Sequence, residues 1–254
     1  MNILKFFRKG IFALLVAATA LIACSKDSDN NDNGGNGGNG NQPDKPIEVP
    51  KGNYGVLIGG VELTSDNYQK INKDNFPAIT EGKVTYDPIQ RILTLDGATI
   101  EATGEEVCAI QQPEGTTATL TIVLKNSNTL NSEESYGIYL NAASLLITGD
   151  GSLTINPNQE IRSISAEKDL TIEGGCSIEA STQIGVYKTL TINKANVHVT
   201  EKDVPAFGVF GKINLIGCEV VFPEGAKEGL YKNQNYYTFL KDSNPCEEVE
   251  IVAN

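Results

Sequence analysis

Short β-prone strings recur along the chain between residues 93 and 215, and this repetition limits the possible folds more than any other feature. Each string is built mostly from Leu, Ile, Val and Thr, residues that are common in strands. One such turn of chain cannot bury its apolar side alone, whereas several stacked turns form a continuous core. Successive strings begin 20 to 29 residues apart, at residues 93–95, 122–124, 145–147, 170–172, 190–192 and 213–215.

Most periods contain two further strand-like segments. Alternating strings follow at residues 98–102, 153–155, 176–180, 195–199 and 218–222, and a third short segment recurs around Ile110, Ile138, Ile164, Val186 and Val209. No segment has convincing helical periodicity. Three strands per period predict an all-β fold, a right-handed parallel β-helix (a solenoid) of about five to six coils.

Two rival folds deserve comparison. A leucine-rich repeat needs an Asn or Cys ladder at fixed offsets and a helical half-repeat, and the sequence has neither. A β-sandwich stays open as an alternative because hairpin-type turns such as residues 149–151 occur.

The flanks of the repeats differ from the repeats themselves, as the caps of a solenoid should, because an uncovered end is a bare sheet edge. Residues 54–63 and 82–95 form the N-terminal flank. At the C-terminus, residues 236–240 and 249–252 are expected to form a closing strand pair. The β-helix domain with its caps is therefore predicted to span residues 53–254.

The same N-terminal segments resemble a known family. The Gly-Gly-Val string at 59–61, Lys-Val-Thr-Tyr-Asp-Pro at 83–88 and Leu-Thr-Leu-Asp-Gly-Ala-Thr-Ile at 93–100 resemble the opening of secreted bacterial β-helix proteins. Many of these are described as carbohydrate-binding domains and are related in fold to the pectate lyases. The resemblance covers roughly residues 53–220 and implies the fold and a carbohydrate ligand. It transfers no catalytic residue.

The first 23 residues look like a targeting segment. A short basic stretch precedes the 13-residue apolar run 11–23, which is the right length for a signal-peptide core. The run ends in Leu-Ile-Ala followed by Cys24, which resembles the lipobox of bacterial lipoproteins. The resemblance implies cleavage before Cys24 and acylation (palmitate among the chains) of that cysteine. The acidic residues 25–29 resemble the export signal of lipoproteins displayed on the outer membrane surface.

Residues 24–52 are predicted to be a linker behind the lipidated cysteine. The segment is rich in Asp, Asn, Gly and Pro and has too few apolar residues to offset the entropy of ordering. A flexible chain of this length spans roughly 25–30 Å, enough to lift the domain off a bilayer.

Charge excludes one class of partner. The chain has a formal net charge of -12, and its basic N-terminal segment makes the remainder more acidic still. Such a surface repels nucleic acid, so nucleic-acid binding is not expected. A membrane contact through the lipid anchor, a glycan ligand and a monomeric state are expected instead.

Four cysteines follow the lipobox: Cys108, Cys176, Cys218 and Cys246. An even number of cysteines in an exported protein is compatible with disulfide bonds. In the predicted register, Ala98, Gly151, Cys176, Ala195 and Cys218 share one inward column of small residues. Cys176 and Cys218 are then two coils, about 9.6 Å, apart. This distance exceeds what a disulfide tolerates, so we expect no bond between them and treat both as small buried residues.

The outward column of the third strand carries aromatic residues. In the predicted register it contains Gln111, Tyr139, Ser165, Tyr187 and Phe210. Exposed aromatic area that packing does not require often marks a binding site, and sugars stack on such surfaces. Tyr139, Tyr187 and Phe210 are therefore the candidate carbohydrate-binding residues. The alternative is an aromatic ladder that only stabilises cross-strand contacts.

Signals for catalysis are weak. His198, the only histidine, is predicted to point outward beside Glu179, and no nucleophile is placed to form a triad. A polysaccharide lyase needs a base and clustered carboxylates, but the outward column that begins at Asp96 is interrupted by Lys125 and Ile216.

The predicted register also places Arg162 at a nominally inward position. No cofactor and no catalytic metal are expected. Calcium is considered only as a weak structural ion in the turns at 126–131, 149–151 and 156–160. The expected function is a non-catalytic, surface-displayed carbohydrate-binding or adhesive module. A lyase-like enzyme and a structural or protein-interaction component are the alternatives.

Overall fold

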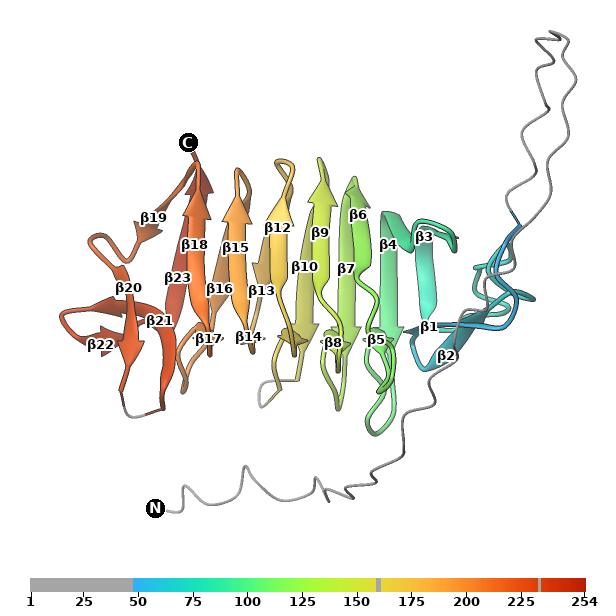
Figure 1. The fold of residues 1–254 in the computed structure, drawn as a ribbon, viewed down its shortest axis with the longest axis horizontal. Coiled ribbons are helices and arrows are strands. Elements are labelled where there is room, and N and C mark those ends of the chain that lie inside the picture. The colour runs from blue at the N-terminus through green and yellow to red at the C-terminus, as the bar shows by residue number, and fades with distance from the viewer. Residues whose placement is uncertain (1–47, 159–160, 233) are drawn as a thin grey trace, which may run out of the picture. The chain divides into compact units, whose positions relative to one another are not determined.

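The described part of the chain is built from stacked strands joined by turns and loops. The computed structural model describes residues 48–158, 161–232 and 234–254. In these residues the regular elements are all strands, and no helix is present. The strands form a β-solenoid of about five turns (Figure 1), which confirms the predicted stack of coils and excludes the β-sandwich.

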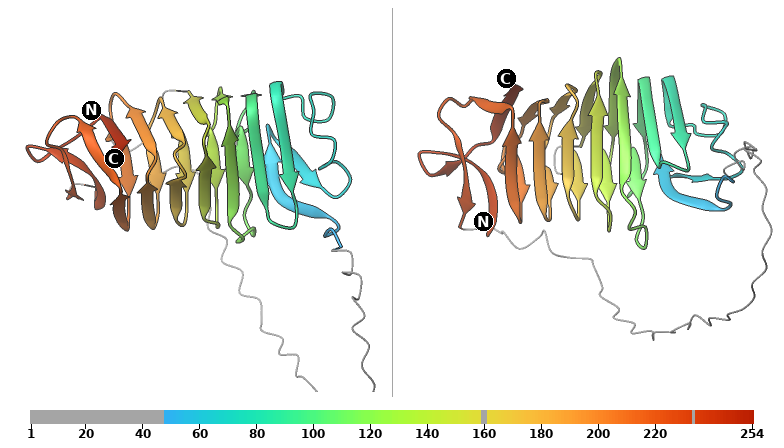
Figure 2. Two further views of the ribbon diagram at one scale, coloured as in Figure 1. Left: turned by 90° about the horizontal axis from the view of Figure 1, so that it is seen from above. Right: turned by 45° about the horizontal axis from the view of Figure 1, so that its top comes forward.

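Each coil contributes three strands, and strands of the same kind pair in parallel along the solenoid (Figure 2). The first row corresponds to the six strings recognised in the sequence. It consists of β4 (Ile92–Ala102), β6 (Leu120–Lys125), β9 (Leu145–Gly149), β12 (Leu170–Glu173), β15 (Thr189–Asn193) and β18 (Lys212–Ile216).

The second row begins with the C-terminal half of β4, which is long enough to pair with β6 through one half and with β7 through the other. The first and second rows therefore belong to one 13-stranded sheet. The second row continues through β7 (Ser127–Ser132), β10 (Ser152–Pro157), β13 (Ser177–Ala180) and β16 (Asn196–Thr200).

The third row forms the centre of a separate 10-stranded sheet. Each of its strands is three residues long. They are β5 (Ile110–Gln112), β8 (Ile138–Leu140), β11 (Ile164–Ala166), β14 (Ile184–Val186) and β17 (Phe207–Val209).

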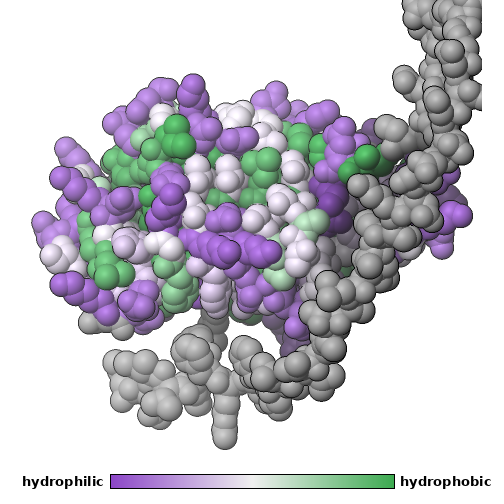
Figure 3. Space-filling view, viewed as in Figure 1, coloured by the Kyte–Doolittle hydropathy of each residue, from purple (hydrophilic) through white to green (hydrophobic). Residues whose placement is uncertain are grey.

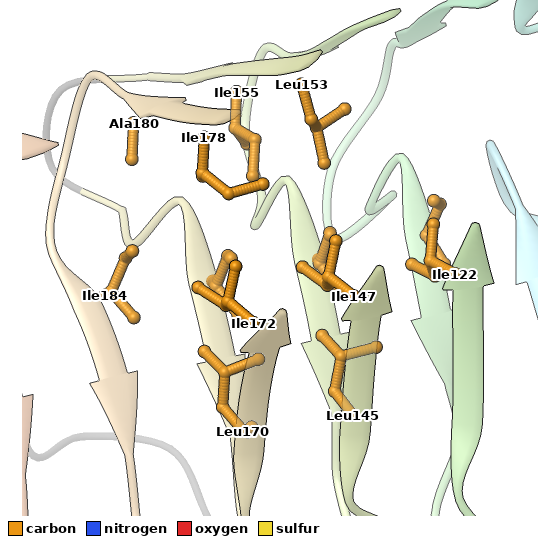
Figure 4. Packing of buried hydrophobic residues seen from close by; sticks show 14 of the residues in the cluster. Ile122, Leu145, Ile147, Leu153, Ile155, Leu170, Ile172, Ile178, Ala180 and Ile184 are labelled. Carbon is orange, nitrogen blue, oxygen red and sulfur yellow. The ribbon is translucent and has the colours of Figure 1, made fainter. Parts of the chain in front are cut away.

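The interior consists of columns of aliphatic side chains that repeat from coil to coil. Ile147 lies between Ile122 and Ile172, and Leu145 lies beside Leu170 (Figure 4). All five are fully or almost fully buried. This register differs by two residues from the predicted one, which paired Ile122 with Leu145. The apolar side still faces inward, because a two-residue shift preserves the side to which a residue points.

Asn128 interrupts an inward column. The register places it between Ala98 and Leu153, and it is 1% exposed. Its Oδ1 accepts from the Ala98 amide at 2.8 Å, and its Nδ2 donates to the carbonyls of Lys125 at 3.0 Å and Ser152 at 3.1 Å. The buried amide is thus satisfied on both sides. Ala98 and Gly151 do not share a column, contrary to the prediction, because β7 and β10 set the register here.

The N-terminal end is covered by antiparallel strands. β1 (Asn53–Ile58) and β2 (Val61–Thr64) form a hairpin, and β1 also pairs with β5. β3 (Ile79–Asp87) runs antiparallel to almost the whole of β4. The positive φ of Gly59 and Gly60 lets the first hairpin turn tightly.

The C-terminal end is also antiparallel, but it differs from the predicted closing pair. β21 (Tyr236–Lys241) pairs with β17, β20 (Lys227–Tyr231) and β22 (Asn244–Pro245), while β23 (Glu248–Ala253) pairs with β16 and β19 (Cys218–Phe222). The prediction that 236–240 and 249–252 pair with each other is therefore wrong. The two segments lie in different sheets, so that each sheet has its own antiparallel strand at this end.

The four cysteines that follow the predicted lipobox are free thiols. The expectation that Cys176 and Cys218 are not bonded to each other is confirmed. Cys176 is fully buried, as predicted, whereas Cys218 is only partly buried. The reason is that β23 lies between β16 and β19, so the strand of Cys218 does not continue the stack above Ala195.

Candidate binding surface

The outer side of the third row carries the predicted aromatic residues, but in two columns instead of one. Tyr139 lies between Gln111 and Ser165, as predicted. The next positions in that column are Gly185 and Gly208. Tyr187 and Phe210 lie two residues further along and start a second column, so the prediction of a single column for all three is wrong. The predicted column places Tyr187 and Phe210 level with Tyr139, whereas the strands pair Ile164 with Ile184 and Ile184 with Phe207.

Five aromatic side chains gather there, and we call them the aromatic strip. The rings of Tyr136 and Tyr139 stack with centroids 5.0 Å apart, and those of Tyr187 and Phe210 also stack at 5.0 Å. The edge of Tyr236 meets Phe210 at 5.8 Å. The sequence reading missed Tyr136, which lies in the turn before β8, and Tyr236, which lies on antiparallel β21. The only sequence signal for Tyr136 is its spacing of three residues from Tyr139.

Exposure is greatest at the second stack. Tyr187 and Phe210 are 46% and 44% exposed, whereas Tyr236 is buried. Tyr139 is partly buried, and burial together with the nearby Glu167 carboxylate raises its pKa to about 12. Tyr139 is therefore a neutral phenol that can donate a hydrogen bond at any physiological pH.

Two long polar side chains lie beside the rings, in space left by glycines. Arg162 lies against Gly185, where a Cβ atom would be 2.8 Å from its Cδ and Nη1 atoms, and Gln183 lies against Gly208. Arg162 Nε donates to Gln183 Oε1 at 2.9 Å. Arg162 is therefore on the outer side of the sheet, and the inward position predicted for it is wrong.

The strip is a surface and not a cavity. Two hollows of about 350 and 400 Å³ lie elsewhere: one is between residues 68–71 and β3, and the other lies over Glu101, Asn131 and Asn156. Figure 3, in the orientation of Figure 1, shows apolar and polar patches interspersed over the strands at the front. The outward residues of the first row include the polar Thr171, Thr191 and Asn214 as well as the apolar Leu146 and Ile216.

His198 points outward beside Glu179, as predicted. Its Nδ1 is 2.9 Å from Glu179 Oε2, and its Nε2 is 3.0 Å from Glu248 Oε1. Burial lowers the pKa of His198, but the hydrogen bonds and charges of Glu248 and Glu179 outweigh burial and raise it overall. Glu248 was missed because it comes from the C-terminal strand, 50 residues along the chain.

No group of three or more His, Cys, Asp or Glu side chains in the described ranges is placed to hold a metal ion. Of the residues considered for calcium at 126–131, residues 127–131 belong to strand β7 and not to a turn. Residues 150–151 form the turn between β9 and β10, and Gly149 is the last residue of β9. The segment 156–160 includes residues 159–160, which lie outside the described part.

Comparison with known proteins gave no relative. No family model matches the chain, and no curated protein or solved structure matches it significantly. The resemblance to secreted carbohydrate-binding β-helix proteins is supported for the fold alone, as a β-solenoid.

The predicted signal peptide, the lipidation residue Cys24 and nearly all of the linker lie outside the described residues. Within the described ranges, no helix is long and apolar enough to cross a bilayer.

Proposed function

We propose that this chain is a non-catalytic carbohydrate-binding or adhesive module on the cell surface, attached to the outer membrane by a lipid on Cys24. The aromatic strip supports the binding part of the proposal. The interior columns already stack the coils, so the fold does not require two large rings at 46% and 44% exposure.

The chemistry of the strip suits sugars. Aromatic rings present apolar surface to the C–H groups of a pyranose, and carbohydrate sites combine such rings with a few oriented polar groups. The Tyr139 phenol and the Arg162 guanidinium supply donors beside the rings. An open surface suits an extended polymer better than a small molecule that needs enclosure.

Stacking of the rings on one another accounts for only part of their area. Tyr187 and Phe210 each cover one side of the other, which is worth about 0.5–1.5 kcal/mol in such pairs. Nearly half of each side chain still faces solvent. We attribute this remaining area to a ligand.

The experiment is a glycan array probed with wild-type protein and with a Tyr139→Ala, Tyr187→Ala, Phe210→Ala triple variant. Ile216→Ala is the matched control, because Ile216 is 50% exposed on the other sheet. We expect binding by wild type and control and loss of at least tenfold in the triple variant. Equal binding by all three proteins would remove the aromatic strip as the site, and absence of wild-type binding would remove the function.

The anchor is tested separately. Wild-type chain expressed in a Gram-negative host should incorporate radiolabelled palmitate and fractionate with the outer membrane, whereas Cys24→Ala should do neither. Cys218→Ala is the matched control and should behave as wild type, because Cys218 lies inside the folded domain. Labelling that persists in Cys24→Ala would contradict the lipidation proposal.

A further inference from the structure

His198 is the only histidine of the chain and lies between strands from two distant parts of the sequence. It belongs to β16, with β13 on one side and the C-terminal strand β23 on the other. Nδ1 contacts Glu179 of β13 at 2.9 Å, and Nε2 contacts Glu248 of β23 at 3.0 Å. The imidazole therefore joins the C-terminal strand to the coil stack. We call Glu179, His198 and Glu248 the clasp.

Both contacts cannot be satisfied by a neutral ring. An ionised carboxylate only accepts hydrogen bonds, whereas a neutral imidazole has one N–H donor and one lone pair. Imidazolium donates from both nitrogens, so protonation satisfies Glu179 and Glu248 together. Deprotonation leaves one carboxylate facing a lone pair.

The neighbouring strands bring further acidic and polar groups to His198. Glu250 of β23 is directly opposite His198 in the antiparallel register, and Thr200 Oγ1 is 3.4 Å from Nε2. In the described ranges, neither Glu179 nor Glu248 has a Lys or Arg nitrogen within 4.0 Å. The charge on His198 is therefore the local counter-charge for carboxylates from both neighbouring strands.

The C-terminal strand β23 also contributes side chains to the hydrophobic core. Val249 and Ile251 are fully buried and pair with Val199 and Val197 of β16. If β23 separated from β16, the interior of the last coil and the edge of β16 would be exposed together. Only β19 lies beyond β23 in this sheet, so separating β23 and β19 from β16 disturbs less of the stack than opening a central strand would.

We propose that the clasp is a pH-sensitive device that holds β23 on the solenoid when His198 is protonated and loosens it when His198 is neutral. The inference is independent of the carbohydrate proposal, because it concerns the second row and not the aromatic strip.

The direction with pH follows from linkage. A histidine whose pKa is higher in the closed state than in the open state stabilises the closed state fully at pH below its open-state pKa. That stabilisation is lost as pH rises through the closed-state pKa. Opening of β23 should therefore increase from mildly acidic to mildly alkaline pH, by about tenfold for each unit between the two pKa values.

The test is native-state hydrogen exchange of the full-length chain, without a histidine tag, followed by NMR at pH 5.5 and 8.5. Protection factors of the Val249 and Ile251 amides are compared with that of Ile172 inside the stack. A single imidazole resonance reports the pKa of His198 directly. We expect the pKa to exceed 6.5 and the protection of β23 to fall several-fold more than that of Ile172 at the higher pH.

Variants separate the clasp from general pH effects. His198→Gln should remove the pH dependence of β23 protection, and Glu248→Gln should reduce it and lower the pKa of His198. Glu62→Gln, at the opposite end of the solenoid, is the matched control and should leave both unchanged. Equal protection of β23 at the two pH values, or an unchanged pH dependence in His198→Gln, would overturn the proposal.

Discussion

The outer sides of the first and third rows differ, although their inner sides are built alike. Both rows point Ile, Leu and Val inward. Outward, the first row carries small polar residues such as Thr171 and Thr191, while the third carries the stacked rings of Tyr187 and Phe210. Stacking of coils thus requires only the interior. Under the proposed function, the exposed rings of the third row serve binding.

The largest effect is expected from the interior shared by both rows. Ile172→Ala should lower the free energy of unfolding by about 2–5 kcal/mol, because Ile172 is fully buried between Ile147 and Ile192. Thr171→Ala, one residue away and pointing outward, should change it by at most about 0.5 kcal/mol. Urea denaturation measures both. Similar losses in the two variants would contradict the assigned inward and outward sides.

The next effect tests Asn128, one of the buried polar residues that interrupt the interior columns. Asn128→Ala removes the partners of the Ala98 amide and of two buried carbonyls, so it should cost about 1–3 kcal/mol. Asn131→Ala, on the outward side of the same strand, should cost much less. Urea midpoints of the two variants make the comparison. An Asn128→Ala protein as stable as wild type would show that the amide is not enclosed.

The smallest effect on stability is expected in the aromatic strip. A double-mutant cycle of Tyr187→Ala and Phe210→Ala should give a coupling of about 0.5–1.5 kcal/mol, as expected for a stacked pair. The same cycle on Thr171 and Thr191 serves as the control from the first row and should give a smaller value. No coupling between Tyr187 and Phe210 would mean that the rings do not stack in solution.

The sequence predicted the coils because their signal is periodic and local. Strings such as 170–172 repeat the same inward pattern, and a two-residue error in register left the faces correct. The prediction from the sequence failed where contacts are non-local. Because Asn favours turns, the sequence predicts a turn at Asn128. In the structure Asn128 lies in a strand, where its side chain hydrogen-bonds to the backbone of Ala98 and Ser152 in the neighbouring coils.

The candidate site was predicted only in part for the same reason. Tyr139, Tyr187 and Phe210 do share one outer side, since alternation along a strand determines the side. Their division into two stacks depends on Gly185 and Gly208, which occupy the column of Tyr139. The side chains of Arg162 and Gln183 pack against these glycines. The contact of Glu248 with His198 depends on an antiparallel strand inserted from the C-terminus, which no repeat period indicates.

Binding by one outer side and not the other is the central claim, and one measurement tests it most directly. Using a glycan that the wild-type chain binds, dissociation constants are measured for a Tyr187→Ala, Phe210→Ala variant and a Thr171→Ala, Thr191→Ala variant. We predict at least tenfold weaker binding for the first and an unchanged constant for the second. Equal weakening of both, or loss confined to the threonine variant, would contradict the assignment of function to the aromatic strip.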